Sequence, residues 1–247
     1  MITFEGRQNK LKTADIIGRK AHSIYPHISG SKLKKRCQDM YNISEFSSKP
    51  MPNFYLNISS KISEIRKILR QSQSFFADLI YSLQDKKVGN CFEEACLAEL
   101  IGKLNGHKNI YVGNIFIKKD NFAKKIKIDH SVAFITDKKI EANKEYHFKN
   151  KEAIIIDPWL GITDFADKYF TQLKNYNRKY FPKLPNQDFL EHLVGTESKN
   201  SKDYREGIKN YCQKINFNIE LAYDANLSDS KENLYKSFFP ELIIKKN

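Results

Sequence analysis

The sequence lacks the patterns that would make it a disulfide scaffold or a membrane protein. Its 4 cysteines among 247 residues are too few and too scattered for a disulfide framework. No run of about 18 apolar residues occurs, so we expect no membrane span. The first residues also lack the basic stretch and apolar stretch of a cleaved signal peptide. We therefore expect a protein that works in the cytoplasm or is secreted without a cleaved signal peptide, and in the second case it could enter a host cell.

The sequence also has little that would bind a nucleotide or a metal. Its 10 glycines form no glycine-rich phosphate loop. Cys91 and Cys96 have four residues between them, which is not the short paired spacing of structural zinc sites. No pair of histidines has the spacing of a zinc-binding helix. We therefore predict no cofactor and no metal site.

Positive charge is what the sequence has in excess, with a formal net charge of +13. Such a charge allows nucleic acid, acidic lipid or an acidic protein as the partner. The lysines, however, are spread along the whole chain, and the clusters at 34–36, 118–119 and 124–125 are short. We interpret the charge as a solvated, lysine-rich surface, and nucleic acid is not the partner we expect.

The chain divides into a short N-terminal part and a longer main domain. Residues 1–58 are interrupted by prolines, and their pattern predicts two short helices over 13–23 and 31–41. We interpret this part as a helical appendage or as a cover packed on the main domain. The main domain would comprise residues 59–247.

Periodicity predicts helices before strands in the main domain. Apolar residues at three- and four-residue steps indicate helices, and runs rich in Ile, Val and Phe indicate strands. We expect an α+β fold in which an antiparallel sheet packs on a central helix. The predicted helices span 59–84, 91–105, 164–173, 188–194, 201–213 and a last stretch from Ser228 or Ser230 to Pro240. The predicted strands span 109–117, 128–136, 153–157 and 215–223, with a polar loop or frayed hairpin end over 137–151.

The central helix begins at a cysteine. Asn90 or Cys91 is the expected N-cap, and Glu93 or Glu94 can close a capping box. The helix is apolar nearly all round, which is typical of a buried element, and Gly106 is expected just after its end. The unpaired N–H groups and the positive dipole end at the helix N-terminus favour a thiolate at Cys91.

Three residues have the types and positions that thiol catalysis needs. A thiol nucleophile requires a base within hydrogen-bond reach, and the base requires an orienting group. Cys91 begins a helix, His130 lies in one predicted strand, and Asp157 closes the next one before a proline. The spacings of 39 and 27 residues allow His130 and Asp157 to be neighbours in a sheet. Asp129 competes for the orienting role, but a neighbour on the same strand points to the opposite face.

The stretches 89–91, 129–132 and 157–161 resemble the papain-like/transglutaminase-like cysteine superfamily. The resemblance is closest to the bacterial effector and toxin branches, which include cysteine proteases and protein glutamine deamidases, and it covers about residues 85–162. It implies a papain-like catalytic domain over 59–247. In this family pattern Cys91 is the nucleophile, His130 the base and Asp157 the orienting group.

The resemblance leaves the oxyanion-binding group open. Phe92 follows the nucleophile where papains and animal transglutaminases commonly have a tryptophan. The amides of Gln84 and Asn90 are the candidates for holding an oxyanion, together with the backbone N–H of Cys91.

These residues predict a cysteine-dependent amide hydrolase or acyl transferase that acts on a protein substrate. The resemblance favours a protease, with a glutamine deamidase or transglutaminase as the alternative, in a secreted bacterial effector acting on a host protein. A third interpretation is a non-enzymatic basic binding module for an acidic protein or nucleic acid. In that case Cys91 would be a buried structural thiol, His130 a core histidine and Asp157 a turn residue.

Overall fold

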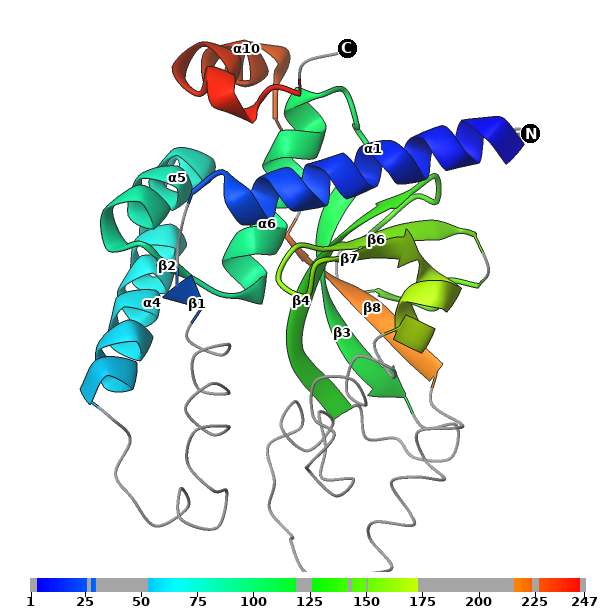
Figure 1. Cartoon of the computed structure of the whole chain (residues 1–247), viewed down its shortest axis with the longest axis horizontal. Helices are drawn as coiled ribbons and strands as arrows, with labels where there is room; N and C mark the ends of the chain where they lie inside the picture. The colour runs from blue at the N-terminus through cyan, green and yellow to red at the C-terminus, as the bar shows by residue number, and fades with distance from the viewer. Residues whose placement is uncertain are drawn as a thin grey trace, which may run out of the picture.

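The structure, a computed structural model, describes residues 4–25, 28–29, 53–118, 126–141, 144–149, 151–172, 216–223 and 227–244. Its main feature within these ranges is a six-stranded sheet (Figure 1). The strands are β3 (Ile110–Lys118), β4 (Ile126–Thr136), β5 (Glu145–Tyr146), β6 (Ala153–Asp157), β7 (Ile162–Phe165) and β8 (Asn216–Tyr223). They lie in the order β5-β8-β3-β4-β6-β7, and every neighbouring pair is antiparallel. This arrangement confirms the predicted α+β class with an antiparallel sheet.

The long strands form where β-branched and aromatic residues concentrate. The strand β6 has its predicted bounds, and β3, β4 and β8 begin and end close to theirs. The two short strands differ from the predictions. The strand β5 lies inside the predicted loop 137–151. The strand β7 occupies the beginning of the predicted helix 164–173, of which residues 166–172 are helical and residue 173 lies outside the described residues. Such short strands form because a neighbouring strand offers hydrogen bonds, so their own pattern is a weak signal.

Helix α6 (Cys91–Leu104) is the centre of the larger hydrophobic core. Every residue from Glu93 to Leu104 is buried, and the helix packs on β3 and β4. Gly106 follows it with a φ of 89°, the left-handed conformation that commonly ends a helix. The predicted buried central helix is therefore confirmed.

The N-terminal helix α1 (Phe4–Ser23) packs across α6, β6 and β7 (Figure 1). Ala14, Ile17 and Ala21 are fully buried in the same core as α6. The described part of residues 1–58 therefore shares a core with α6, and α4 (Asn53–Gln71) runs across the predicted boundary at 58/59; the division into an appendage or cover and a main domain stays a prediction. None of the helices in the described ranges is long and apolar enough to cross a bilayer.

Two helices stand where one long helix over 59–84 was predicted. They are α4 (Asn53–Gln71) and α5 (Phe75–Lys86). The chain leaves the helix at Ser72, whose Oγ accepts a hydrogen bond of 2.9 Å from the backbone N of Ser74. Serine side chains compete in this way with the helical hydrogen bonds. The prediction of one continuous helix was therefore wrong.

The remaining elements are short or lie near the C-terminus. A parallel pair of two-residue strands, β1 (Ile28–Ser29) and β2 (Val88–Gly89), ties the N-terminal part to the residues directly before Cys91. Near the C-terminus, α10 (Asp229–Phe238) has as its N-cap Ser228, one of the two predicted candidates, and the 3-10 helix η1 (Pro240–Leu242) follows it. The predicted helices over 31–41, 188–194 and 201–213 lie outside the described residues.

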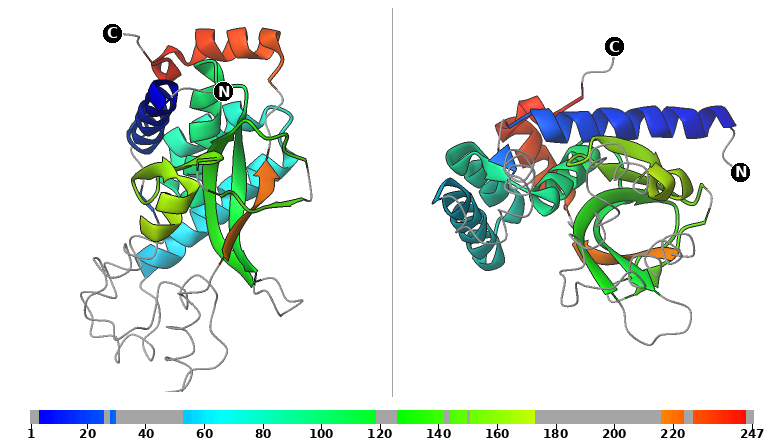
Figure 2. Two further views of the ribbon diagram at one scale, coloured as in Figure 1. Left: turned by 90° about the vertical axis from the view of Figure 1, so that its right-hand side faces the viewer. Right: turned by 60° about the horizontal axis from the view of Figure 1, so that its bottom comes forward.

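Both faces of the sheet carry buried side chains. One face packs against α1 and α6. The other face holds a second cluster that includes Phe134, Ile155 and Tyr169, and Figure 2 shows the strong curvature of the sheet. Side chains alternate between faces along a strand. His130 of β4 and Asp157 of β6 therefore belong to the same face as this second cluster.

Candidate active site

His130 and Asp157 come from adjacent strands and form a buried, hydrogen-bonded pair. In the β4–β6 ladder Ala133 lies opposite Ile156, so His130 is a diagonal neighbour of Asp157 on one face rather than directly opposite it. Nε2 of His130 lies 2.6 Å from Oδ2 of Asp157. The exposed fractions of the two side chains are 3% and 0%. The structure thus brings together the residues that were predicted as base and orienting group.

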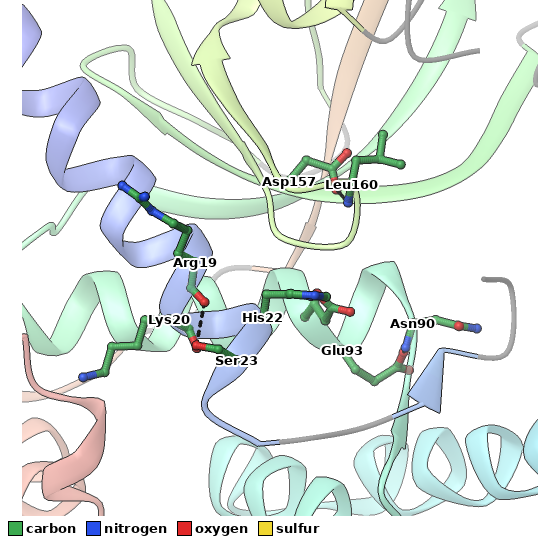
Figure 3. Close-up of polar contacts among 9 residues, drawn as sticks. Arg19, Lys20, His22, Ser23, Asn90, Glu93, Asp157 and Leu160 are labelled. Carbon is green, nitrogen blue, oxygen red and sulfur yellow. Dashed lines mark hydrogen bonds and ion pairs between the residues drawn. The ribbon is translucent and has the colours of Figure 1, made fainter. Parts of the chain in front are cut away.

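The Asp157 carboxylate is held by two further donors. The backbone N of Leu160 donates to Oδ1 at 3.0 Å, and the hydroxyl of Tyr169 donates to Oδ2 at 2.7 Å. Figure 3 shows Leu160 beside the carboxylate. Tyr169 is fully buried, and burial together with the charge of Asp157 raises its pKa well above the usual value. The tyrosine therefore stays protonated and fixes the carboxylate as a donor. Sequence reasoning missed this residue because a tyrosine at an apolar position looks like ordinary core.

Cys91 is the first residue of α6 and is half-buried. The preceding Asn90 is the N-cap, and its backbone N donates to Oε2 of Glu93 at 2.9 Å. Figure 3 shows these two residues at the beginning of the helix. The Cys91 side chain is close enough to the imidazole of His130 to raise its pKa. Because Nε2 of the ring is paired with Asp157, Nδ1 is the nitrogen left for the thiol. The three predicted residues therefore form a line of neighbouring side chains, in which the imidazole is hydrogen-bonded to Asp157.

The imidazole in this line is charged at neutral pH. Burial opposes the protonation of His130, but the charge and hydrogen bond of Asp157, with those of Cys91, raise the pKa of His130 from 6.5 to about 10. The charged ring puts a positive charge next to the sulfur, in addition to the positive end of the helix dipole.

Trp159 completes the setting of the imidazole. Its ring meets the His130 ring edge-on, with a centroid distance of 5.6 Å. Trp159 follows Asp157 by two residues, just after the strand end at Pro158. The segment that supplies the carboxylate therefore also supplies an aromatic contact that restricts the ring. Trp159 is the single tryptophan of the chain.

Cys91 opens onto a groove of about 400 Å³. The walls come from α4, α5, the beginning of α6 and the strands β3 and β4. The lining residues are Arg66, Leu69, Arg70, Phe75, Cys91, Phe92, Asn114 and Ser131. A substrate segment in this groove would reach the sulfur, while the Asp157 side of the imidazole stays buried.

The oxyanion candidates have different positions in the structure. Gln84 is exposed on α5 and is not among the described residues that line the groove. Asn90 lies directly before the nucleophile as the N-cap. Asn114 of β3, which sequence reasoning missed, lines the groove beside Cys91, and its Oδ1 accepts a hydrogen bond of 2.7 Å from Ser131. That bond leaves the Nδ2 hydrogens of Asn114 as donors to a group in the groove. A lone asparagine inside a strand gave no signal in the sequence.

Two further predictions concern residues near the site. Cys96 is fully buried in the core, as predicted, and burial raises its pKa well above the usual value. The Asp129 side chain lies outside the described residues, so its exclusion from the orienting role stays a prediction.

Neither a metal site nor a relative identifies this arrangement. In the part of the chain that the structure describes, no group of three or more His, Cys, Asp or Glu side chains could hold a metal ion. Comparisons with protein-family models, with curated proteins and with solved structures found no match. The geometry of Cys91, His130 and Asp157 is therefore the main guide to the reaction that this site could catalyse.

Proposed function

We propose that this protein is a cysteine-dependent amide hydrolase or acyl transferase that acts on a protein substrate and has a papain-like/transglutaminase-like core. The observation that carries the proposal is the buried His130–Asp157 hydrogen bond next to Cys91, whose side chain lines a groove at the beginning of α6. A purely structural histidine–aspartate pair would need no half-buried thiol on the other ring nitrogen.

The first half of the reaction forms an acyl-enzyme. The Cys91 sulfur attacks the carbonyl carbon of the substrate amide, and the carbonyl electron pair moves onto oxygen. Donors at the beginning of α6 and the Asn114 amide are placed to stabilise that oxyanion. The intermediate collapses when His130 gives the Nδ1 proton to the leaving nitrogen. The amine or ammonia leaves, and a thioester to Cys91 remains.

The second half releases the acyl group. Water or an amine attacks the thioester carbonyl while His130, now neutral, takes its proton at Nδ1. The carbon–sulfur bond breaks, and the Cys91 thiolate is restored beside the imidazolium. Throughout both steps, the Nε2–H group of His130 donates its hydrogen bond to Asp157. The carboxylate of Asp157 in turn accepts hydrogen bonds from Leu160 and Tyr169. This anchoring preserves the tautomer that the proton transfers need.

Proteolysis, glutamine deamidation and transamidation share this thioester. They differ in the amide that is attacked and in the nucleophile that releases the acyl group. We place proteolysis first, in line with the family resemblance, with deamidation or transamidation as the alternative. The same proposal includes a role as a secreted bacterial effector with a host protein as its substrate.

The first test is the reactivity of the thiol. Iodoacetamide should modify Cys91 in the folded protein faster than free cysteine at the same pH, and Cys96 should react only after unfolding because it is buried. Peptide mapping by mass spectrometry assigns the rate to each site. A Cys91 rate no faster than that of free cysteine would remove the basis of the proposal.

The second test identifies the reaction. Host-cell proteins are incubated with the wild-type protein and, as a blank, with Cys91→Ala. New fragments indicate proteolysis, a gain of about one dalton indicates deamidation, and a cross-linked sum of masses indicates transamidation, since all three follow from one thioester. A product that the alanine variant also makes would exclude the thiol mechanism.

A further inference from the structure

The groove beside Cys91 has a positively charged wall. Arg66 and Arg70 lie one helical turn apart on α4, so both side chains project from the same face of the helix. Both line the groove together with the apolar side chains of Leu69, Phe75 and Phe92. A substrate segment that reaches the sulfur therefore passes two guanidinium groups and an apolar surface.

The guanidinium group of Arg66 forms an ion pair within the protein. Its Nε donates to Oε1 of Glu93 at 2.9 Å, and the Glu93 side chain is fully buried. The other oxygen of that carboxylate accepts from the backbone N of Asn90 at the beginning of α6. Arg66 thus neutralises the residue that caps the catalytic helix.

The guanidinium group of Arg70 forms no such ion pair with the residues that the structure describes. The side chain is exposed, and no carboxylate of the described residues lies within ion-pair distance of it. A solvated guanidinium on the wall of a groove matches a carboxylate in charge and in its planar, two-pronged hydrogen-bond geometry. The net charge of +13 also favours the approach of an acidic partner.

We propose that the groove selects an acidic segment of a protein substrate, in which an Asp or Glu carboxylate near the target amide pairs with Arg70. The adjacent Leu69, Phe75 and Phe92 contact an apolar side chain of the same segment. This inference rests on the proposed function, because it assigns the groove to the substrate of Cys91.

The test uses small thiol reagents of different charge, so it needs no known substrate. Three methanethiosulfonates are compared at low salt: the neutral methyl reagent, the anionic sulfonatoethyl reagent and the cationic trimethylammonioethyl reagent. The rate at Cys91 is measured by peptide mapping. The ratio of the anionic to the cationic rate reports the local charge of the groove, because the helix dipole and the imidazolium affect all variants alike.

Charge reversal at Arg70 should change this ratio. Arg70→Glu should lower the ratio by about tenfold, since it changes the charge by two units on the wall of the groove that Cys91 also lines. Arg70→Gln should produce about half of that change on a logarithmic scale. The matched control is Lys67→Glu, an equal charge change at an exposed position of α4 outside the groove lining, and it should alter the ratio by less than about twofold.

The outcomes separate this inference from the proposed function. If the neutral reagent modifies Cys91 no faster than free cysteine, the thiol chemistry fails. If the neutral reagent reacts fast but the ratio is equal in wild type, Arg70→Gln and Arg70→Glu, the acidic-substrate inference is overturned while the thiol chemistry stands. Melting temperatures near the wild-type value show that the variants are folded.

A protection experiment tests the class of ligand. A short glutamate-rich peptide should slow the modification of Cys91 by the neutral reagent, and its glutamine counterpart should protect far less. The protection should be lost in Arg70→Glu. Stronger protection by an oligonucleotide of equal charge, or no protection by the acidic peptide, would overturn the inference.

Discussion

Replacement of Asp157 by asparagine is the most direct perturbation of the site. The carboxylate accepts hydrogen bonds from His130, Tyr169 and Leu160, and it is fully buried. An asparagine side chain of the same shape has one acceptor oxygen and one amide group that only donates. In the variant the amide NH₂ replaces one of the two carboxylate oxygens. If it replaces Oδ1, it faces the backbone N–H of Leu160; if it replaces Oδ2, it faces the donors of His130 and Tyr169.

The expected loss of stability is large. Removal of one partner from a buried ion pair costs about 3–5 kcal/mol. The pKa of His130 is raised by the charge and the hydrogen bond of Asp157, which agrees in sign with a stabilising ion pair. We therefore expect Asp157→Asn to lower the free energy of unfolding at pH 7 by about 3–5 kcal/mol. If Asp157 were only a turn residue, as one interpretation of the sequence had it, asparagine would replace it with little loss of stability. The burial of its carboxylate among three hydrogen-bond donors argues against that interpretation.

The control is the same substitution at Asp137. That exposed carboxylate forms a surface ion pair with Lys10 at 3.1 Å, and such pairs contribute about 0–1 kcal/mol. Urea unfolding at pH 7 gives both free energies. Equal effects of Asp157→Asn and Asp137→Asn would refute the buried ion pair.

The pH dependence gives a second measurement on the same variant. A folded-state pKa above the unfolded value means that the stabilisation by His130 is fully present below about pH 6.5 and is lost as the pH rises through about 10. The fluorescence of Trp159, which contacts the imidazole, should titrate near pH 10 in the wild type. In Asp157→Asn burial dominates, so the midpoint should fall below 6.5. An unchanged midpoint would show that Asp157 does not stabilise the charged ring.

Three further predictions concern the surroundings of the site. Tyr169→Phe removes one donor to the buried carboxylate and should cost about 1–2 kcal/mol in urea unfolding, with slower alkylation of the active thiol as the orientation of the imidazole loosens. Ser131→Ala removes the donor to the amide oxygen on β3; it should slow product formation by a few-fold while the thiol alkylation rate stays near that of the wild type, because the sulfur–imidazole pair is untouched. Gly113→Ala would place a methyl group 2.3 Å from Cγ2 of Ile219, and a lower melting temperature should show an overpacking cost of about 1–3 kcal/mol.

Local patterns were sufficient for the central elements and for the types of the site residues. The strand β6 and the buried helix α6 could be predicted because each is rich in apolar residues and has a clear end, at Pro158 and at Gly106. The candidates Cys91, His130 and Asp157 could be selected because each lies in, or at the end of, a regular element. These features depend on residues that are close in the sequence.

Other features depend on contacts between segments that are far apart in the sequence. The short strand β7 and the packing of α1 against α6 were not predicted correctly or were left open, since neighbouring elements decide them. The same holds for Tyr169, Asn114 and Arg70, whose residue types are common in cores, strands and exposed helix faces.

The sequence by itself therefore determined the class of fold, the buried helix and the three candidate residues of the proposed site. Only the tertiary structure decided that His130 pairs with Asp157 and that Tyr169 and Leu160 hold the carboxylate. It also decided that Arg70, which has no ion-pair partner among the residues that the structure describes, lines the groove. The physical reason is that periodicity and capping are local properties of the chain. Hydrogen bonds between β4 and β6, and the burial that shifts the pKa of His130, exist only once the sheet and helices have packed.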